Sequence, residues 1–339
     1  MDKAERGTPG FRARRRRLLQ SLAGAVLAGP AAAQAKQLVP FQRLNSRPTL
    51  RIIVPFAPGG TSDIVARLLS ARLPDALGQT VIVENRAGAN GNIGIAAVAR
   101  AKPDGRTLLL VSSAFVTNPA MAGDAPAYDA QAQFAPVGLV ATSPDVIIVA
   151  AAGPYRRLED LIERARREPG ALSYATPGAG NSVHLGGERL WRQAGVTLLH
   201  VPYTGAGPAV MAVLGGQVDC GLAALPAAQA QLASGGLRAL AVGSPQAWEG
   251  LPGVPTTAQS GFPGSETLQA LFAPAGTPQA DIQRLNQALR QVLAEPALAG
   301  QMRAQGFLPA GGPPEALAAR VAEELPRWAE VARGLRGAH

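Results

Sequence analysis

The stretch Leu50-Arg51-Ile52-Ile53-Val54-Pro55-Phe56-Ala57-Pro58-Gly59-Gly60-Thr61-Ser62-Asp63 joins a short β-branched run to a glycine-rich turn. Apolar residues then recur at helical spacing, at Ile64, Val65, Leu68, Leu69 and Leu73. This order predicts a strand, a loop at its carboxyl end and a helix. Glycines let the backbone approach a ligand, and the following helix presents free N–H groups. Such a loop is suited to binding a carboxylate or a phosphate.

The same strand-loop-helix order continues along the chain. Further strands are predicted at 80–83, 107–111, 137–140, 146–150, 172–175, 197–201, 217–223 and 237–242. Helices are predicted at 93–101, 158–167, 183–194, 278–293 and 314–333, with Thr277 as an N-cap and a break or kink near Pro326. Apolar strands that alternate with helices indicate an α/β fold with a parallel sheet covered on both faces.

Connections near 141–146 and 262–270 divide this pattern into two halves. We expect lobe 1 to comprise residues 46–143 and 264–339, and lobe 2 to comprise residues 144–263, with a cleft between them. Glycine loops at 176–182 and 202–207 repeat the design of the first loop in the second half. Loops from opposite lobes are able to clamp one small anion. For each loop alone, a purely structural turn is the competing interpretation.

Three polar residues near these loops carry open alternatives. Asp63, in a first helical turn, either complements the helix dipole or receives an ammonium or hydroxyl group of a ligand. Ser182 and His184 resemble a nucleophile and a base, but residues two apart do not face each other on a helix. A capping role for His184 is therefore favoured.

Composition excludes several classes of function. The net charge is +9, of which residues 1–35 contribute +5, and the remaining basic residues form no run interleaved with aromatics, so nucleic-acid binding is not expected. The single cysteine, Cys220, lies in an apolar segment and is expected to be a buried thiol. Three scattered histidines, together with the lack of a dinucleotide or P-loop motif, predict neither a metal nor a cofactor.

The first 35 residues have the pattern of a secretory signal peptide. Basic residues Arg12 and Arg14 to Arg17 precede an apolar segment at 18–28, and A-x-A sites predict cleavage after Ala33 or Ala35. The arginine run also approximates a twin-arginine signal, which leaves the export route open. We expect a periplasmic protein without a lipid anchor.

A series of motifs, in order, resembles the Bug receptors, which are TctC-like substrate-binding proteins of tripartite tricarboxylate transporters. The resemblance is carried by residues 55–63, 83–94, 103–105, 118–119, 134–137, 174–185, 201–203, 215–219, 254–256 and 273–278. It implies a two-lobed α/β periplasmic-binding-protein fold of the "Venus flytrap", type II-like kind, with two crossover segments and an interlobe cleft. It also implies a non-catalytic receptor for a dicarboxylate, tricarboxylate, acidic amino acid or aromatic acid, delivered to membrane subunits of a transporter.

The loops and the resemblance together define the expected ligand-binding residues. They are Phe56, Ala57, Pro58, Gly59, Gly60, Thr61, Asp63, Ser113, Asn118, Thr176, Gly180, Ser182, His184, Tyr203, Thr204 and Gly205. The chain departs from the family pattern at 211–213, at Leu268, where the family often has tryptophan, and at 121–133. A monomer is expected, since no heptad pattern is present. A ligand-sensing subunit of a signalling system and a secreted hydrolase using Ser182 and His184 are the alternatives.

Overall fold

A computed structural model of the chain describes residues 48–123 and 125–336. The predicted signal peptide lies outside the described residues. Those residues belong to one compact unit, Gln42–His339. Within the described ranges, none of the helices has the length and apolar character needed to cross a bilayer.

Two sheets share one long strand. In sheet A, strands β2 (Val81–Asn85), β1 (Leu50–Val54) and β3 (Thr107–Ser112) are parallel, and β9 (Glu266–Pro274) pairs antiparallel with β3. Strand β4 (Phe134–Ala150) pairs antiparallel with β9 and with β10 (Leu308–Pro309). In sheet B, the second part of β4 pairs with β7 (Cys220–Ala224) and β8 (Leu237–Val242), and β5 (Ser173–Thr176) lies between β7 and β6 (Leu199–Pro202).

Helices cover both faces of each sheet. Sheet A carries α1 (Thr61–Ser70), α2 (Leu73–Leu77), α9 (Gln279–Leu293) and α10 (Pro296–Ala304) on one face. On its other face lie α3 (Asn92–Ala99), preceded by the 3₁₀ turn η2 (Ala89–Gly91), α4 (Ala114–Ala122) and α11 (Pro314–Arg336). Sheet B carries α5 (Leu158–Arg167) and α6 (Ser182–Gln193) on one face and α7 (Ala206–Leu214) and α8 (Leu225–Ala233) on the other.

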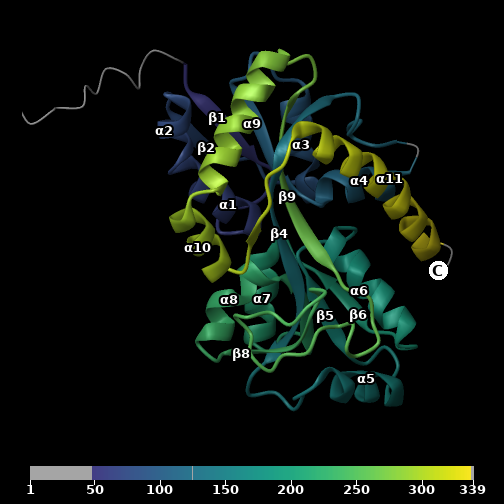
Figure 1. Cartoon of the computed structure of the whole chain (residues 1–339). Helices are drawn as coiled ribbons and strands as arrows, with labels where there is room; N and C mark the ends of the chain where they lie inside the picture. Colours follow the sequence, from purple (N-terminus) through teal and green to yellow (C-terminus); the bar gives the residue numbers. More distant parts are fainter. Residues whose placement is uncertain (1–47, 124, 337–339) are drawn as a thin grey trace, which may run out of the picture. The chain divides into compact units, whose positions relative to one another are not determined.

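Strand alternation explains these layers. In β1, Leu50, Ile52 and Val54 belong to one apolar core while Ile53 belongs to the core on the opposite face. Strands buried on both faces need continuous apolar sequence, which is the pattern of residues 52–54 and 108–111. Figure 1 shows β4 and β9 running from the lobe built on sheet A to the lobe built on sheet B.

Four details differ from the sequence analysis. The sheets are mixed rather than parallel, because β4 and β9 run antiparallel to their neighbours. Residues 137–140 and 146–150 belong to the single strand β4, since the segment between them pairs with β9. Helix α9 begins at Gln279 with Pro278 as N-cap, and Thr277 Oγ1 instead donates to the Pro274 carbonyl at 2.7 Å. Helix α11 continues through Pro326, so the predicted helix is not broken there.

Candidate functional site

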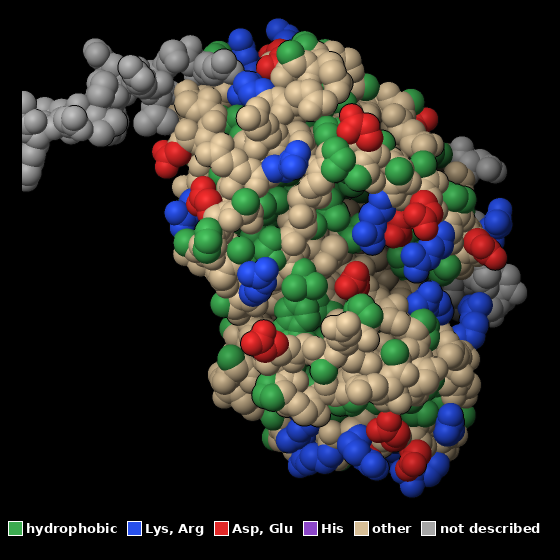
Figure 2. All heavy atoms as spheres, viewed as in Figure 1, with side chains coloured by type: hydrophobic (Ala, Val, Ile, Leu, Met, Phe, Trp, Pro, Cys, Tyr) green, Lys and Arg blue, Asp and Glu red, His purple; other side chains and the backbone are tan. Residues whose placement is uncertain are grey.

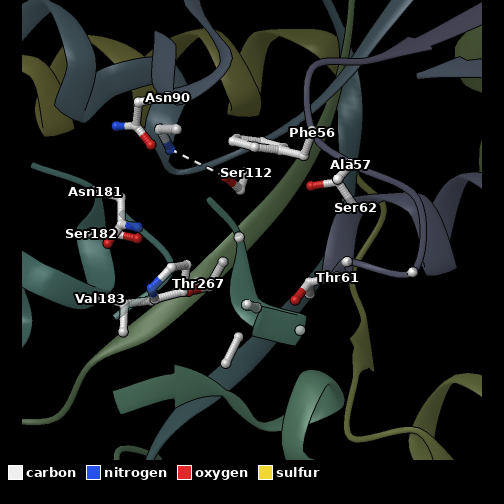
Figure 3. Close-up of a pocket in the computed structure, with 18 of the residues that line it drawn as sticks. Phe56, Ala57, Thr61, Ser62, Asn90, Ser112, Asn181, Ser182, Val183 and Thr267 are labelled. Carbon is white, nitrogen blue, oxygen red and sulfur yellow. Dashed lines mark hydrogen bonds between the residues drawn. The ribbon is translucent and has the colours of Figure 1, made fainter. Parts of the chain in front are cut away.

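A cavity of about 240 Å³ lies between the two lobes. Figure 3 shows Phe56, Ala57, Thr61 and Ser62 on one side of it and Asn181, Ser182 and Val183 on the other. We call it the main cavity. Its lining residues are Phe56, Ala57, Pro58, Gly59, Gly60, Thr61, Ser62, Asn90, Ser112, Ala114, Pro177, Asn181, Ser182, Val183, Gly205, Ala206, Gly207, Pro208, Ala224, Thr267 and Gln269.

The wall formed by sheet A is the start of helix α1. Gly60 is the N-cap of this helix, with extended backbone angles, and Gly59 has φ of +80°, a conformation that favours glycine. The first N–H groups of a helix have no intrahelical acceptor, so those of Thr61 and Ser62 are available at the cavity edge.

The carboxylate of Asp63 stabilises this loop through hydrogen bonds on the side away from the cavity. Its Oδ2 accepts from the Gly59 N–H at 2.9 Å and from Arg67 Nε at 2.8 Å, and its Oδ1 accepts from Asn85 Nδ2 at 3.0 Å. Burial raises the pKa of Asp63, but these hydrogen bonds outweigh it and leave the pKa below its ordinary value. The carboxylate is therefore ionised and fully engaged in shaping the turn.

The wall formed by sheet B contains two more helix starts. Asn181 caps α6, its Oδ1 accepting from the His184 N–H at 2.8 Å, and Ser182 and Val183 follow at the cavity surface. Gly205 precedes α7 with φ of +151°, and Ala206 and Gly207 open that helix. Helix α4 adds a fourth start through Ala114. Ala224, the N-cap of α8, also lines the cavity, so the partial positive charges of five helix starts face one space.

The floor of the cavity is strand β9. Thr267 and Gln269 point to this side of the strand, and Gln269 is fully buried. Gln269 Oε1 accepts from Ser62 Oγ at 2.8 Å, whereas Gln269 Nε2 has no hydrogen-bond partner among the described residues. A buried amide donor without a partner is costly, which makes this group a candidate ligand contact.

Two histidines, His184 on α6 and His200 on β6, support the loop at 176–182. The Gly180 N–H donates to His184 Nδ1 at 3.0 Å, and Thr176 Oγ1 lies 2.7 Å from His200 Nε2. The two imidazoles stack with their centroids 3.8 Å apart. Burial, followed by the neighbouring His184, lowers the pKa of His200 to about 4. His184 is thus committed to the loop backbone rather than to Ser182.

Half of the expected binding residues line the main cavity. They are Phe56, Ala57, Pro58, Gly59, Gly60, Thr61, Ser182 and Gly205. The other expected residues lie outside the lining: Asp63, Ser113, Asn118, Thr176, Gly180, His184, Tyr203 and Thr204. Among them, Ser113 Oγ accepts from the Leu268 N–H at 2.9 Å, and Asn118 donates to the Asn90 carbonyl at 2.9 Å.

The sequence analysis missed the residues that reach the cavity from outside the three loops. They are Asn90, Ser112, Ala114, Val183, Pro208, Ala224, Thr267 and Gln269. Gln269 offered one usable signal, because it is a lone amide within the apolar strand segment 268–272.

No ionisable side chain is among the residues that line the main cavity. In the part of the chain that the structure describes, no three His, Cys, Asp or Glu side chains gather so as to hold a metal ion. The chemistry of the site is therefore that of helix N-termini, hydroxyls and amides, which suits an anion with an apolar body.

Known proteins share these features. A model of the tripartite tricarboxylate transporter family receptor matches residues 65–336. A UPF0065 protein encoded in the tcbD-tcbE intergenic region of Pseudomonas sp. (strain P51) is 39% identical, over 90% of this chain and 92% of the relative. Protein BugT of Bordetella pertussis (strain Tohama I) is 36% identical, over 84% and 88% of the two chains.

Solved structures agree in fold. The periplasmic binding protein BugD has a TM-score of 0.80 at 36% identity, covering 84% of this chain and 97% of its own. R. palustris Rpa4515 with adipate has a TM-score of 0.80 at 32% identity, covering 84% and 96%. MatC of Rhodopseudomonas palustris with bound malate has a TM-score of 0.77 at 31% identity, covering 84% and 98%. The two-lobed periplasmic-binding-protein fold is thereby confirmed, and the chain belongs to the tripartite tricarboxylate transporter family of receptors, which are periplasmic solute-binding proteins.

Proposed function

We propose that the mature protein is an exported receptor that captures one small organic acid in the main cavity and delivers it to membrane subunits of a tripartite tricarboxylate transporter. The observation that carries this proposal is the convergence of helix starts from both lobes on a cavity without ionisable lining. A carboxylate bound there receives N–H groups from both walls and holds the lobes together.

The buried amide of Gln269 supports the same ligand class. Its Nε2 donor lacks a partner among the described residues, and a carboxylate oxygen or a bridging water satisfies it. Two similar receptors, Rpa4515 and MatC, were solved with adipate and with malate. A dicarboxylate is therefore the first class of acid to test.

The lining argues against an amino-acid ligand. An ammonium group in a closed cavity needs a carboxylate or several carbonyl oxygens in place of water. The main cavity offers no Asp or Glu side chain, and Asp63 is engaged with Gly59, Arg67 and Asn85. We therefore place acids that lack an amine ahead of acidic amino acids.

Lobe boundaries and export complete the proposal. We assign residues 46–143 and 264–339 to lobe 1 and residues 144–263 to lobe 2, because β4 and β9 are the strands that cross between them. The mature chain is proposed to act as a monomer after removal of residues 1–33 or 1–35 and release into the periplasm.

The proposal is tested by thermal unfolding of refolded protein with succinate, malate, adipate, citrate, benzoate and aspartate. A ligand at a hundred times its dissociation constant stabilises the folded state by about 2.7 kcal/mol, which raises the melting temperature by several degrees. We expect such a shift with dicarboxylates and none with aspartate. No shift with any of the acids, in folded protein, contradicts the proposal.

The pair Gly60→Asp and Gly60→Asn locates the site. Gly60 has φ of −78°, which other residues also adopt. A Cβ added at this position would have the Ala57 carbonyl oxygen as its nearest neighbour, at 3.4 Å. Both side chains are favoured N-caps, so folding is retained. Gly60→Asp places a negative charge where the ligand's carboxylate is expected to bind. We therefore expect Gly60→Asp to bind the organic acid at least about 10-fold more weakly than Gly60→Asn does. Equal affinities remove the α1 start from the site.

A further inference from the structure

A second cavity, of about 400 Å³, lies on the opposite face of strand β9. Thr267 and Gln269 face the main cavity, while the alternating Glu266 and Leu268 face the second one. It separates helix α11 of one lobe from helix α6 of the other (Figure 1). Figure 2 shows a hollow beside the second half of α11 with basic side chains along its rim, and the basic residues that line the cavity are arginines.

Three arginines from both lobes line this cavity. Arg189 extends from α6, and Arg320 and Arg327 extend from α11. The cavity also contains two carboxylates, those of Glu266 and Glu324. Cations therefore outnumber anions in a space that both lobes enclose.

The carboxylate of Glu324 is already engaged. Its Oε2 accepts from Trp328 Nε1 at 2.6 Å, and its Oε1 lies 3.7 Å from Arg320 Nε and 3.8 Å from Arg327 Nη1. This side chain is 11% exposed, so the cluster is fixed within α11. It offers no free charge to Arg189.

Arg189 is the cation left without an anion. Its Nη2 donates to the Gly264 carbonyl at 3.0 Å, its Nε is buried without a partner, and no carboxylate of a described residue lies within ion-pair distance. Burial, and next the like charge of Arg327, lower the pKa of Arg189 below its usual value. A half-buried guanidinium that faces another cation is stabilised by an external anion.

We propose that the second cavity is a binding site for a small organic oxyanion, a carboxylate or a phosphate, held between Arg189 of one lobe and Arg320 and Arg327 of the other. Arginine is suited to this because its fork of donors matches both carboxylate and phosphate. The apolar walls, formed by Leu185, Leu268 and Val331, leave room for an organic body beside the charged group.

Calorimetric titration with citrate and with inorganic phosphate tests the site. Citrate carries carboxylates on an organic body, whereas phosphate is the oxyanion alone. Comparing the two probes therefore shows whether the site prefers an organic acid or a free phosphate. We expect Arg189→Gln to weaken binding of whichever probe the wild type binds by at least about 10-fold. Arg189→Lys keeps the charge but loses the fork of donors, so we expect it to weaken binding by less than Arg189→Gln does. Arg303→Gln, an exposed position on α10, makes the same charge change away from the cavity and should leave binding unchanged.

The variant Gly60→Asp separates this site from the main cavity. If the probe still binds to Gly60→Asp but no longer binds to Arg189→Gln, the result supports the second site. Loss in Gly60→Asp with no loss in Arg189→Gln assigns the probe to the main cavity and overturns the proposal. Lack of binding of either probe to the wild type at millimolar concentration also overturns it. The dicarboxylate response is measured separately, so the proposed receptor function stands or fails independently.

Discussion

The side-chain amide of Asn90, which lines the main cavity, donates to the carbonyl of Ala179 at 3.3 Å, from one lobe to the other. The same Asn90 amide donates to Asn118 Oδ1 at 2.8 Å, while Asn118 Nδ2 donates to the Asn90 carbonyl at 2.9 Å and to Asn92 Oδ1 at 2.8 Å. Asn90 has φ of +53°, a left-handed conformation that asparagine tolerates better than most residues. These hydrogen bonds therefore orient the Asn90 side chain toward the opposite lobe.

Asn90→Gly is expected to weaken ligand binding through this contact. Glycine adopts the same backbone angles but lacks the amide, so the closed arrangement loses one interlobe hydrogen bond, worth about 0.5–1.5 kcal/mol. That corresponds to roughly a 2- to 12-fold loss of affinity, measured by calorimetry with the acid that gives the largest thermal shift. Asn92→Gly, which removes one acceptor of Asn118 without touching Ala179, serves as the control. Equal losses in both variants contradict the interlobe role.

Gln269→Met is expected to separate binding from stability. Methionine has a similar volume, so the floor of the cavity stays filled, but the donor aimed at the ligand is gone. The lost bond to Ser62 is offset by removal of a buried amide nitrogen that has no partner among the described residues. We expect about a 10-fold weaker affinity with little change in the unfolding midpoint in urea. A large fall in stability with unchanged affinity identifies Gln269 as a structural residue.

Local patterns were sufficient for much of the fold. The strands at 50–54, 107–112 and 237–242 and the helix at 158–167 were predicted closely, because their apolar spacing is complete within a few residues. Strands β4 and β9 were not, because Ser143-Pro144-Asp145 interrupts the apolar run. Their partners lie some 120 residues apart in sequence, as in the bond from Thr267 to Asp145, so no local window contains the pairing.

The candidate site divides in the same way. The loop residues 56–61 were identified because their glycines precede a helix with visible periodicity. Asp63 shares that sequence context, yet its carboxylate turns toward Asn85 from the next strand. Asn90 reaches the cavity only through tertiary packing, which the residue type alone does not reveal. Gln269 stands out as an amide in an apolar strand, but the cavity that it lines follows only from the pairing of β9 with β4.

Gly94→Ala is expected to displace the backbone that leads into the Phe56 loop of the main cavity. A Cβ at Gly94 would lie 2.7 Å from the Arg86 carbonyl and 2.8 Å from Pro55 Cα, so the backbone that leads into Phe56 must move. We expect a loss of about 1–3 kcal/mol of stability and a weaker affinity. Gly300→Ala is the matched control, because its helical position in α10 is open and alanine there should stabilise the protein by about 0.5–1 kcal/mol. Equal effects of the two changes contradict the clash.

Strand β4 contains a carboxylate with a raised pKa where it passes from one sheet to the other. Asp145 is buried where β4 crosses between the sheets, and it accepts from Ser265 Oγ at 2.5 Å and from Thr267 Oγ1 at 2.8 Å. Burial raises the pKa of Asp145 to about 6, although these two hydrogen bonds lower it. Between about pH 4 and 6 the folded state thus holds a proton that the unfolded chain has lost, so stability falls as pH rises through this window.

Asp145→Asn removes this pH dependence and uncovers an opposite one. His200, with a pKa of about 4, stays neutral in the fold and is protonated in the unfolded chain between about pH 4 and 6.5, so its contribution to stability rises with pH over that range. In the wild type the two slopes oppose each other. The free energy of unfolding is measured with urea at several pH values. In Asp145→Asn we expect it to increase from pH 4 to 6.5. At pH 7 we expect it to exceed the wild-type value by up to about 3 kcal/mol. Asp145→Asn combined with His200→Asn should have a smaller slope than Asp145→Asn alone, and the remaining rise comes from His184, whose pKa burial also lowers. A single variant that follows the wild-type curve assigns the dependence to other groups.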